Sequence, residues 1–130
     1  MLSEEKNITY IGHKKNIKRL LEEVDCLILP SYREGLSNVV LEALSMEVPV
    51  IASNVPGCKD IVLHNKTGLL VNKEDPESIK DALTFLMNNK NLCKNFGENV
   101  RVHIEKNFTN EIINNQTFDL YKKIIGRKWN

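Results

Sequence analysis

The sequence has only three cysteines, and no two of them form a Cys-x-x-Cys pair. Cys26, Cys58 and Cys93 are odd in number and far apart, which argues against a disulfide framework and against a structural zinc site. The three histidines fall at unrelated spacings and predict no ligand cluster. We therefore expect no metal and no other cofactor, and a reducing compartment for the thiols.

An excess of charge of one sign and long apolar runs are also lacking. Eighteen Lys and Arg stand against seventeen Asp and Glu, so the net charge of +1 gives no reason to expect a nucleic-acid partner. No apolar run approaches the roughly 20 residues of a membrane-spanning helix, and no N-terminal stretch resembles a signal peptide. We expect a cytoplasmic protein, at most peripheral at the inner membrane face.

The sequence does contain enough apolar residues for one core. At 130 residues and 42% hydrophobic content, the chain can form one domain but is small for a complete two-substrate enzyme. Apolar runs predict strands at residues 7–12, 26–30, 49–53 and 69–71. Helical spacing predicts helices at residues 15–24, after a cap at Ser37 or Asn38, within 58–63, after a cap at Asp75, at about 92–106 and after a cap at Thr109. This alternation predicts an α/β fold with a doubly wound parallel sheet, and ligands beyond the carboxyl ends of its strands.

Two of the predicted strands, at residues 26–30 and 49–53, are continuous apolar runs. Such runs are typical of strands that helices cover on both faces. We therefore expect both to be buried in the middle of the protein. Cys26, at the start of the first run, is interpreted as a core residue.

The stretch from Pro30 to Glu42 passes from a strand through a polar loop into a helix. Such a junction directs unpaired backbone N–H groups and the positive end of the helix dipole at one spot, where anions bind readily. Glu34 in the loop and Glu42 in the helix are at most about 12 Å apart if all the intervening chain is helical. Two carboxylates at that separation suit the hydroxyls of a nucleotide-diphosphate sugar, although either glutamate alone would be interpreted as a surface acid.

Five segments in order carry a resemblance to a known family: residues 30–31, 34–43, 48–52, 67–72 and 75–77. They closely resemble the C-terminal domain of family 4 retaining glycosyltransferases of the GT-B fold, and the similarity runs from about residue 7 to 125. In that family this domain binds the nucleotide-sugar donor. The resemblance implies that residues 1–130 are a single, partial donor-binding domain. The acceptor-binding N-terminal domain, the first two strands and a basic Arg/Lys pair of the family are absent from the sequence.

The resemblance also implies a role for each residue of the loop. Glu34 would be the catalytic residue beside the donor sugar, and Glu42 would accept from the ribose diol. Backbone amides around four residues would hold the diphosphate, and four further residues would lie near the base and ribose: Gly35, Leu36, Ser37 and Asn38 for the first set, and Gly12, His13, Pro30 and Ser31 for the second. The partner would be a nucleotide-diphosphate sugar with an acceptor of unknown kind, and the helix dipole and amides would stand in for a metal cation.

Two alternatives remain open from the sequence. One is a sugar-nucleotide epimerase of the same overall fold, and the other is a nucleotide-sugar-binding fragment without turnover. The sequence also departs from the family at Glu47, where a glycine usually ends the helix, and at Pro56, where glycine is common. Glu47 is expected to lose the favoured left-handed helix terminus.

The resemblance also implies a strand order. The strands at 26–30, 49–53 and 69–71 would be neighbours in that order. The first of them would present an apolar edge that could pair with residues 7–11 or with a second copy of the chain.

Overall fold

The computed structural model describes residues 7–128, with side chains to residue 123. Its sheet has three parallel strands in the order β1 (Leu27–Leu29), β2 (Val50–Ser53) and β3 (Leu69–Val71). The helices are α1 (Ile17–Leu21), α2 (Asn38–Ser45), α3 (Pro56–Lys59), α4 (Pro76–Asn88), α5 (Lys90–Asn107) and α6 (Asn110–Lys128). The α/β fold with a parallel sheet, and the order of these three strands, confirm the sequence prediction.

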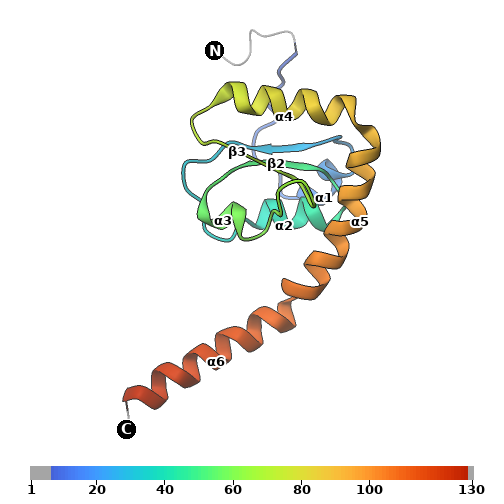
Figure 1. The fold of residues 1–130 in the computed structure, drawn as a ribbon. Coiled ribbons are helices and arrows are strands. Elements are labelled where there is room, and N and C mark those ends of the chain that lie inside the picture. Colours follow the sequence, from blue (N-terminus) through green and yellow to red (C-terminus); the bar gives the residue numbers. More distant parts are fainter. Residues whose placement is uncertain (1–6, 129–130) are drawn as a thin grey trace.

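Helices cover both faces of the sheet, as Figure 1 shows: α4 lies across one face, α1, α2 and α3 lie on the other, and α5 packs against α2 and α4. The central strand β2 contributes side chains to the core on both faces of the sheet, because successive side chains of a strand point to opposite faces. Val50 and Ala52 pack with the α2 and α3 layer, whereas Ile51 packs with Leu86 of α4 and Phe96 of α5. All four residues of β2 are buried, which confirms that this strand is covered on both faces.

The predicted strand at residues 7–12 is wrong. These residues form no strand in the described part of the chain, and the Tyr10 side chain is 82% exposed. Alternating apolar residues become a strand only beside a hydrogen-bonding neighbour, and this segment pairs with none of the described strands.

The burial predicted for residues 26–30 is also only partly right. Ile28 is 37% exposed because β1 lies at the edge of the described sheet. The exposed apolar edge that the strand order implied is therefore present. Cys26 is half-buried against the α4 layer, and burial raises the pKa of its thiol to about 11, so the group is a protonated packing residue at neutral pH.

The end of α2 differs from the expectation for Glu47. This residue does adopt the left-handed conformation, with φ of 62°. Its N–H donates to the Leu44 carbonyl at 2.9 Å, and the Val48 N–H donates to the Ala43 carbonyl at 2.9 Å. This is the paired hydrogen bonding of a Schellman end, formed here without glycine.

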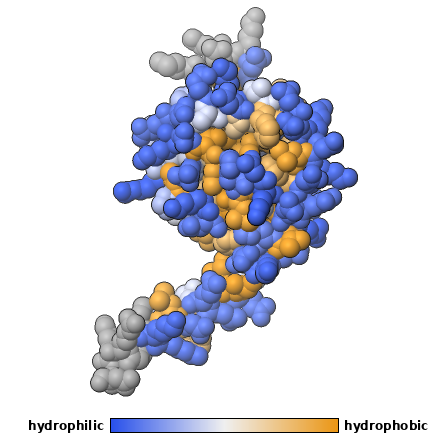
Figure 2. All heavy atoms as spheres, viewed as in Figure 1, coloured by the Kyte–Doolittle hydropathy of each residue, from blue (hydrophilic) through white to orange (hydrophobic). Residues whose placement is uncertain are grey.

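The last helix, α6, extends away from the body of the protein (Figure 1). It begins as predicted at a Thr109 cap, whose Oγ1 accepts from the Ile112 N–H at 3.3 Å. Phe118, Leu120 and Tyr121 are more than half exposed, so these apolar residues of the helix find no core here. Figure 2 shows hydrophobic side chains among hydrophilic ones along this segment. None of the described helices has the length and apolar character that a membrane crossing requires.

Candidate functional site

The loop between β1 and α2 carries the carboxylate of Glu34. Because the three strands are parallel, this loop lies at the same end of the sheet as the loops that follow β2 and β3. Ser31 Oγ donates a hydrogen bond of 2.7 Å to Glu34 Oε1, and Ser31 N–H donates one of 3.0 Å to Ser53 Oγ. Ser53 is only 2% exposed at the end of β2. The Glu34 carboxylate is thus connected by two successive hydrogen bonds, through Ser31, to the buried last residue of the central strand.

The helix that follows this loop begins without a cap from its own side chains. Ser37 occupies the N-cap position with extended backbone angles, φ −77° and ψ 105°, but its side chain makes no capping hydrogen bond. The first turn of α2 contains no acidic residue. Since the first N–H groups of a helix have no partner within the helix, an anion at this point would gain several donors and the favourable end of the dipole. Ser37, one of the two predicted cap residues, therefore occupies the N-cap position, but the predicted capping hydrogen bond is not made and the first amides of the helix stay uncapped.

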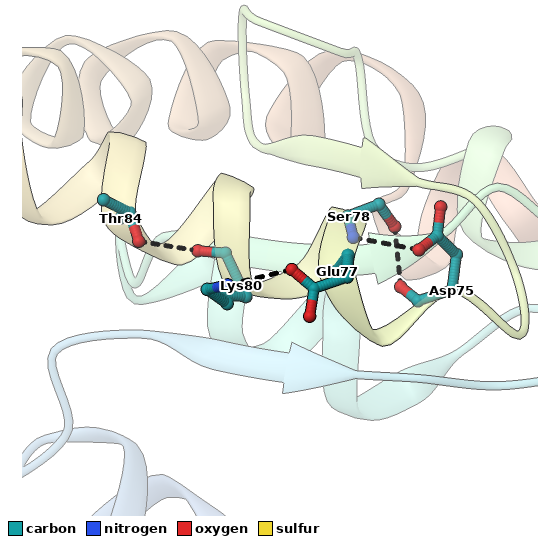
Figure 3. Close-up of polar contacts among 5 residues, drawn as sticks. All are labelled: Asp75, Glu77, Ser78, Lys80 and Thr84. Carbon is teal, nitrogen blue, oxygen red and sulfur yellow. Dashed lines mark hydrogen bonds and ion pairs between the residues drawn. The ribbon is translucent and has the colours of Figure 1, made fainter.

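The helix α4 begins after β3 in the same way, and its N-terminus is occupied by groups of the chain itself (Figure 3). Asp75 Oδ1 accepts from the Ser78 N–H at 3.1 Å, and Ser78 Oγ donates to the Asp75 carbonyl at 2.8 Å. Glu77 in the first turn pairs with Lys80 at 2.9 Å. The cap predicted at Asp75 is confirmed.

Glu42 lies on the exposed side of α2. It borders an open groove of about 790 Å³ that also contains Leu36 of the preceding loop and Asn38 at the start of the same helix. Lys15, which precedes α1, and Lys18, within α1, line the groove as well. The structure thereby brings Glu42 together with two of the predicted diphosphate-binding positions. Two basic side chains that sequence reasoning did not single out lie along the same groove.

A second, smaller cleft lies on the other side of the Glu34 loop. It has a volume of about 290 Å³ and includes Pro30 and Ser31, both predicted as site residues. Tyr32, Ser53 and Asn72 line it as well, and none of these three was predicted as a site residue. They come from loops and strand ends far apart in the chain. Because the strands are parallel, all three residues lie at the carboxyl ends of the strands.

Gly12 and His13 are not gathered into this arrangement. Both are exposed, and no hydrogen bond within the described part of the chain joins either of them to the Glu34 loop. Gly12 has a positive φ of 63°, which accounts for glycine at that position independently of any ligand.

Cys58 directly follows Gly57, which packs against the backbone of the Glu34 loop. Burial raises the pKa of the Cys58 thiol, and the nearby negative charge of Glu34 raises it further. Elsewhere among the described residues, no group of three or more His, Cys, Asp or Glu side chains is arranged to hold a metal ion.

This geometry agrees with a match to a known family. The model for "Glycosyl transferases group 1" matches residues 2–103, which include the Glu34 loop, α2 and all three strands. The chain belongs to this family. The match confirms the resemblance seen in the sequence and decides between the two enzyme classes in favour of the glycosyltransferase over the epimerase.

Relatives support the same assignment. The chain is 32% identical over 124 residues to the capsular polysaccharide biosynthesis glycosyltransferase CapM of Staphylococcus aureus, covering 95% of this chain and 33% of CapM. Among solved structures, S. aureus TarM, crystallised with UDP, superposes with a TM-score of 0.81 at 26% identity, covering 90% of this chain and 24% of TarM. Anabaena HepE in complex with UDP-glucose superposes with a TM-score of 0.84 at 19% identity, covering 92% of this chain and 33% of HepE, and shows the shared fold. This glycosyltransferase chain thus spans about a third of the length of the CapM relative.

Proposed function

We propose that this chain is the donor-binding part of a retaining glycosyltransferase and that residues 1–130 form one partial domain of it. The observation that carries the proposal is the uncapped N-terminus of α2, directly after a loop whose Glu34 carboxylate is oriented by Ser31. A helix N-terminus without its own acid suits a diphosphate, and a fixed carboxylate beside it suits a sugar. The acceptor would be bound by a separate domain.

In this proposal each part of the loop has one task. The diphosphate binds the amides of Gly35, Leu36, Ser37 and Asn38. Glu34 accepts hydrogen bonds from the donor sugar and stabilises the positive charge that develops there, while Glu42 accepts from the ribose diol. Pro30, Ser31, Gly12 and His13 are proposed to border the base and ribose.

The relatives support a particular donor and a particular kind of product. TarM and HepE were crystallised with UDP or UDP-glucose, and CapM is named for capsular polysaccharide biosynthesis. We therefore propose a nucleotide-diphosphate sugar donor, with a uridine nucleotide tested first, and a role in the synthesis of a glycan or glycoconjugate.

The experiment is a titration of the ¹⁵N-labelled chain with UDP, GDP and ADP, followed through the amide resonances. We expect the largest shifts at Gly35 to Asn38 and an affinity of about 1 mM, some −4 kcal/mol, because one domain supplies only part of the site. Uridine is the matched control, since it lacks the diphosphate and should leave these resonances in place. Shifts confined to other parts of the chain, or equal binding of uridine, would contradict the proposal.

The same preparation tests for turnover. We expect no sugar transfer by this chain alone, since the acceptor-binding part is supplied by another domain. A product assay with UDP-glucose and candidate acceptors measures this directly. Turnover comparable to that of an intact enzyme would show that the chain is more than a donor-binding part.

We further propose that the open edge of β1 allows a second copy of the chain to associate. Ile28 is partly exposed there, and an edge strand presents unpaired backbone groups. Light scattering across a concentration series should show a mass that rises with concentration, and Ile28→Lys should abolish the rise. A constant monomeric mass would exclude this association.

A further inference from the structure

Residues 53–57, from the last residue of β2 to the second residue of α3, pack against the Glu34 loop, and Gly57 meets the backbone of that loop. A Cβ atom built on Gly57 would overlap the carbonyl oxygen of Gly35 and would lie 2.5 Å from the carbonyl oxygen of Glu34. Both neighbours are backbone atoms, so no side-chain rotation can make room. Only glycine fits at this position while the loop keeps its place.

The contact fixes the direction in which the loop presents its amides. In a planar trans peptide the C=O and the following N–H point in opposite directions. With the Glu34 and Gly35 carbonyls packed onto Gly57, the N–H groups of Gly35 and Leu36 must point away from α3. These are two of the amides to which the proposed function assigns the diphosphate.

The same segment supports the carboxylate of the loop. Its first residue is Ser53, whose buried Oγ accepts from Ser31 N–H, and Ser31 Oγ in turn donates to Glu34 Oε1. One short stretch of chain therefore sets both the amides and the acid of the loop.

The segment is itself well anchored. Asn54 N–H donates to the Val71 carbonyl at 2.7 Å, which ties it to β3. Val55 is 4% exposed, and Pro56 occupies the start of α3, where its fixed φ suits a helix. Because residues 53–57 are held in place by these contacts, a side chain added at Gly57 should displace the Glu34 loop and not the segment itself.

We propose that Gly57 and Ser53 are positioning residues for donor binding: Gly57 orients the Gly35 and Leu36 amides, and Ser53 orients the Glu34 carboxylate through Ser31. The inference rests on the proposed function for the identity of the ligand. The contacts of Gly57 and Ser53 with the Glu34 loop are observed independently of that function. Because a misplacement of about 1 Å can cost up to 10²-fold in a reaction that depends on alignment, small displacements of this loop should be measurable.

The test compares Gly57→Ala and Ser53→Ala with the control Gly68→Ala in the 130-residue chain. A Cβ on Gly68 would lie 2.6 Å from the Val50 carbonyl oxygen, so this control also forces a backbone shift. It does so at the start of β2, at the opposite end of the sheet from the loop. Three quantities are measured: the thermal midpoint, the UDP dissociation constant, and the amide resonances of Gly35 and Leu36 without ligand.

We expect all three variants to lower the thermal midpoint. Gly57→Ala should weaken UDP binding by about fivefold or more and move the Gly35 and Leu36 resonances, and Ser53→Ala should weaken it about two- to threefold, with Gly68→Ala unchanged in both respects. Gly57→Ala that loses stability but keeps its UDP affinity and its loop resonances would overturn the proposal.

Two further outcomes are also decisive. If Gly57→Ala fails to fold, Ser53→Ala decides, and an unchanged UDP affinity in that variant overturns the proposal. If the unaltered chain binds no UDP, the proposed function fails, and the ligand-free spectra then decide the positioning role alone. Unmoved Gly35 and Leu36 resonances in the folded Gly57→Ala variant, or unmoved Ser31 and Glu34 amide resonances in the Ser53→Ala variant, would overturn it.

Discussion

Two junctions of this protein have the same architecture and opposite chemistry. After β1 and after β3 the chain leaves a parallel strand, makes a short loop and begins a helix. Both junctions lie at the carboxyl ends of the strands. At α4 the helix end is closed by Asp75, Ser78 and Glu77, whereas at α2 the cap residue Ser37 makes no capping bond and the first turn has no acid. The difference shows that the fold supplies several places for an anion, and that side chains decide which one stays open.

The open end has an energetic cost that the closed end avoids. A capping side chain stabilises a helix by about 1 kcal/mol, and an acid near the N-terminus adds about 0.3–1 kcal/mol. The α2 end forgoes both. Such a loss of stability is typical of functional sites, and the variants below either close the open helix end or open the closed one.

The largest difference should appear when the acids beside the open end are removed. In a protein that joins this chain to its acceptor-binding domain, Glu34→Ala should lower turnover about 100-fold, because Glu34 acts on charge that develops in the reaction. Glu42→Ala should mainly raise the Michaelis constant for the donor, because the ribose is bound equally in the ground and transition states. Steady-state kinetics separate the two. Both variants within a factor of two of the unaltered protein would refute the site assignment.

Closing the open end should weaken diphosphate binding while stabilising the fold. Asn38 is the exposed first residue of α2, and Asn38→Asp changes its charge with almost no change of shape. The new carboxylate should gain about 0.3–1 kcal/mol from the helix dipole. It should also repel the diphosphate and reduce its affinity about tenfold. Thermal melts and a UDP titration should therefore move in opposite directions.

Asn38→Ser is the matched control for that experiment, because it removes the amide without adding charge. Its UDP affinity should remain within about twofold of the unaltered chain. If Asn38→Asp binds UDP as well as the serine variant does, the diphosphate does not lie at this helix end.

Opening the closed end should affect stability alone. Asp75→Ala removes the acceptor for the Ser78 N–H and should cost about 1 kcal/mol, which corresponds to a fall of about 3–5 °C in the thermal midpoint. UDP affinity should not change, because the proposed diphosphate site is at α2 and the Asp75 carboxylate, which borders the cleft of Pro30 and Ser31, already accepts from the Ser78 N–H. Asp75→Asn is the control that can still cap and should recover most of the loss. A drop in UDP affinity with Asp75→Ala would mean that the two junctions act as one site.

The sequence alone predicted features whose cause is local. The apolar runs of β2 and β3, the Asp75 cap and the Thr109 cap depend on residues within a few positions of one another, and all were found. Residues 7–12 were wrongly predicted as a strand. The alternation of apolar and polar residues indicates which side chains could be buried, but it does not indicate whether a neighbouring strand is present. Pairing is a property of the whole sheet.

The residues of the proposed donor site divide in the same way, into those with a local cause and those without one. Glu34, Glu42 and the helix start were visible as a pattern, whereas the hydrogen bond from Ser31 to Ser53 joins residues 22 positions apart. The close packing of Gly57 on the loop is equally non-local. Nothing in the sequence around either residue signals a contact with Glu34, so only the folded chain identifies them.

The smallest effect concerns the other end of α2, where the expectation for Glu47 failed. The hydrogen bonds of the Schellman end form although Glu47 has φ of 62°, so the helix ends correctly with a residue that is strained there. Contacts of the Glu47 side chain offset part of this strain, because it packs on Gly97 and pairs with Arg101 at 3.8 Å. That ion pair is largely exposed and contributes only a few tenths of a kcal/mol.

Glu47→Gly should therefore stabilise the protein by about 0.5 kcal/mol, since relief of about 1 kcal/mol of backbone strain exceeds the lost contacts. Glu47→Ala loses the same contacts and keeps the strain, so it should be destabilising. Urea unfolding of the two variants measures the difference, which we expect to be about 1 kcal/mol. Equal stability of the glycine and alanine variants would mean that the left-handed end carries no strain. UDP affinity should be the same in the glycine and alanine variants, because Glu47 follows the C-terminus of α2 and the uncapped amides are at its N-terminus. The two variants therefore change the stability of the helix without changing the proposed binding site.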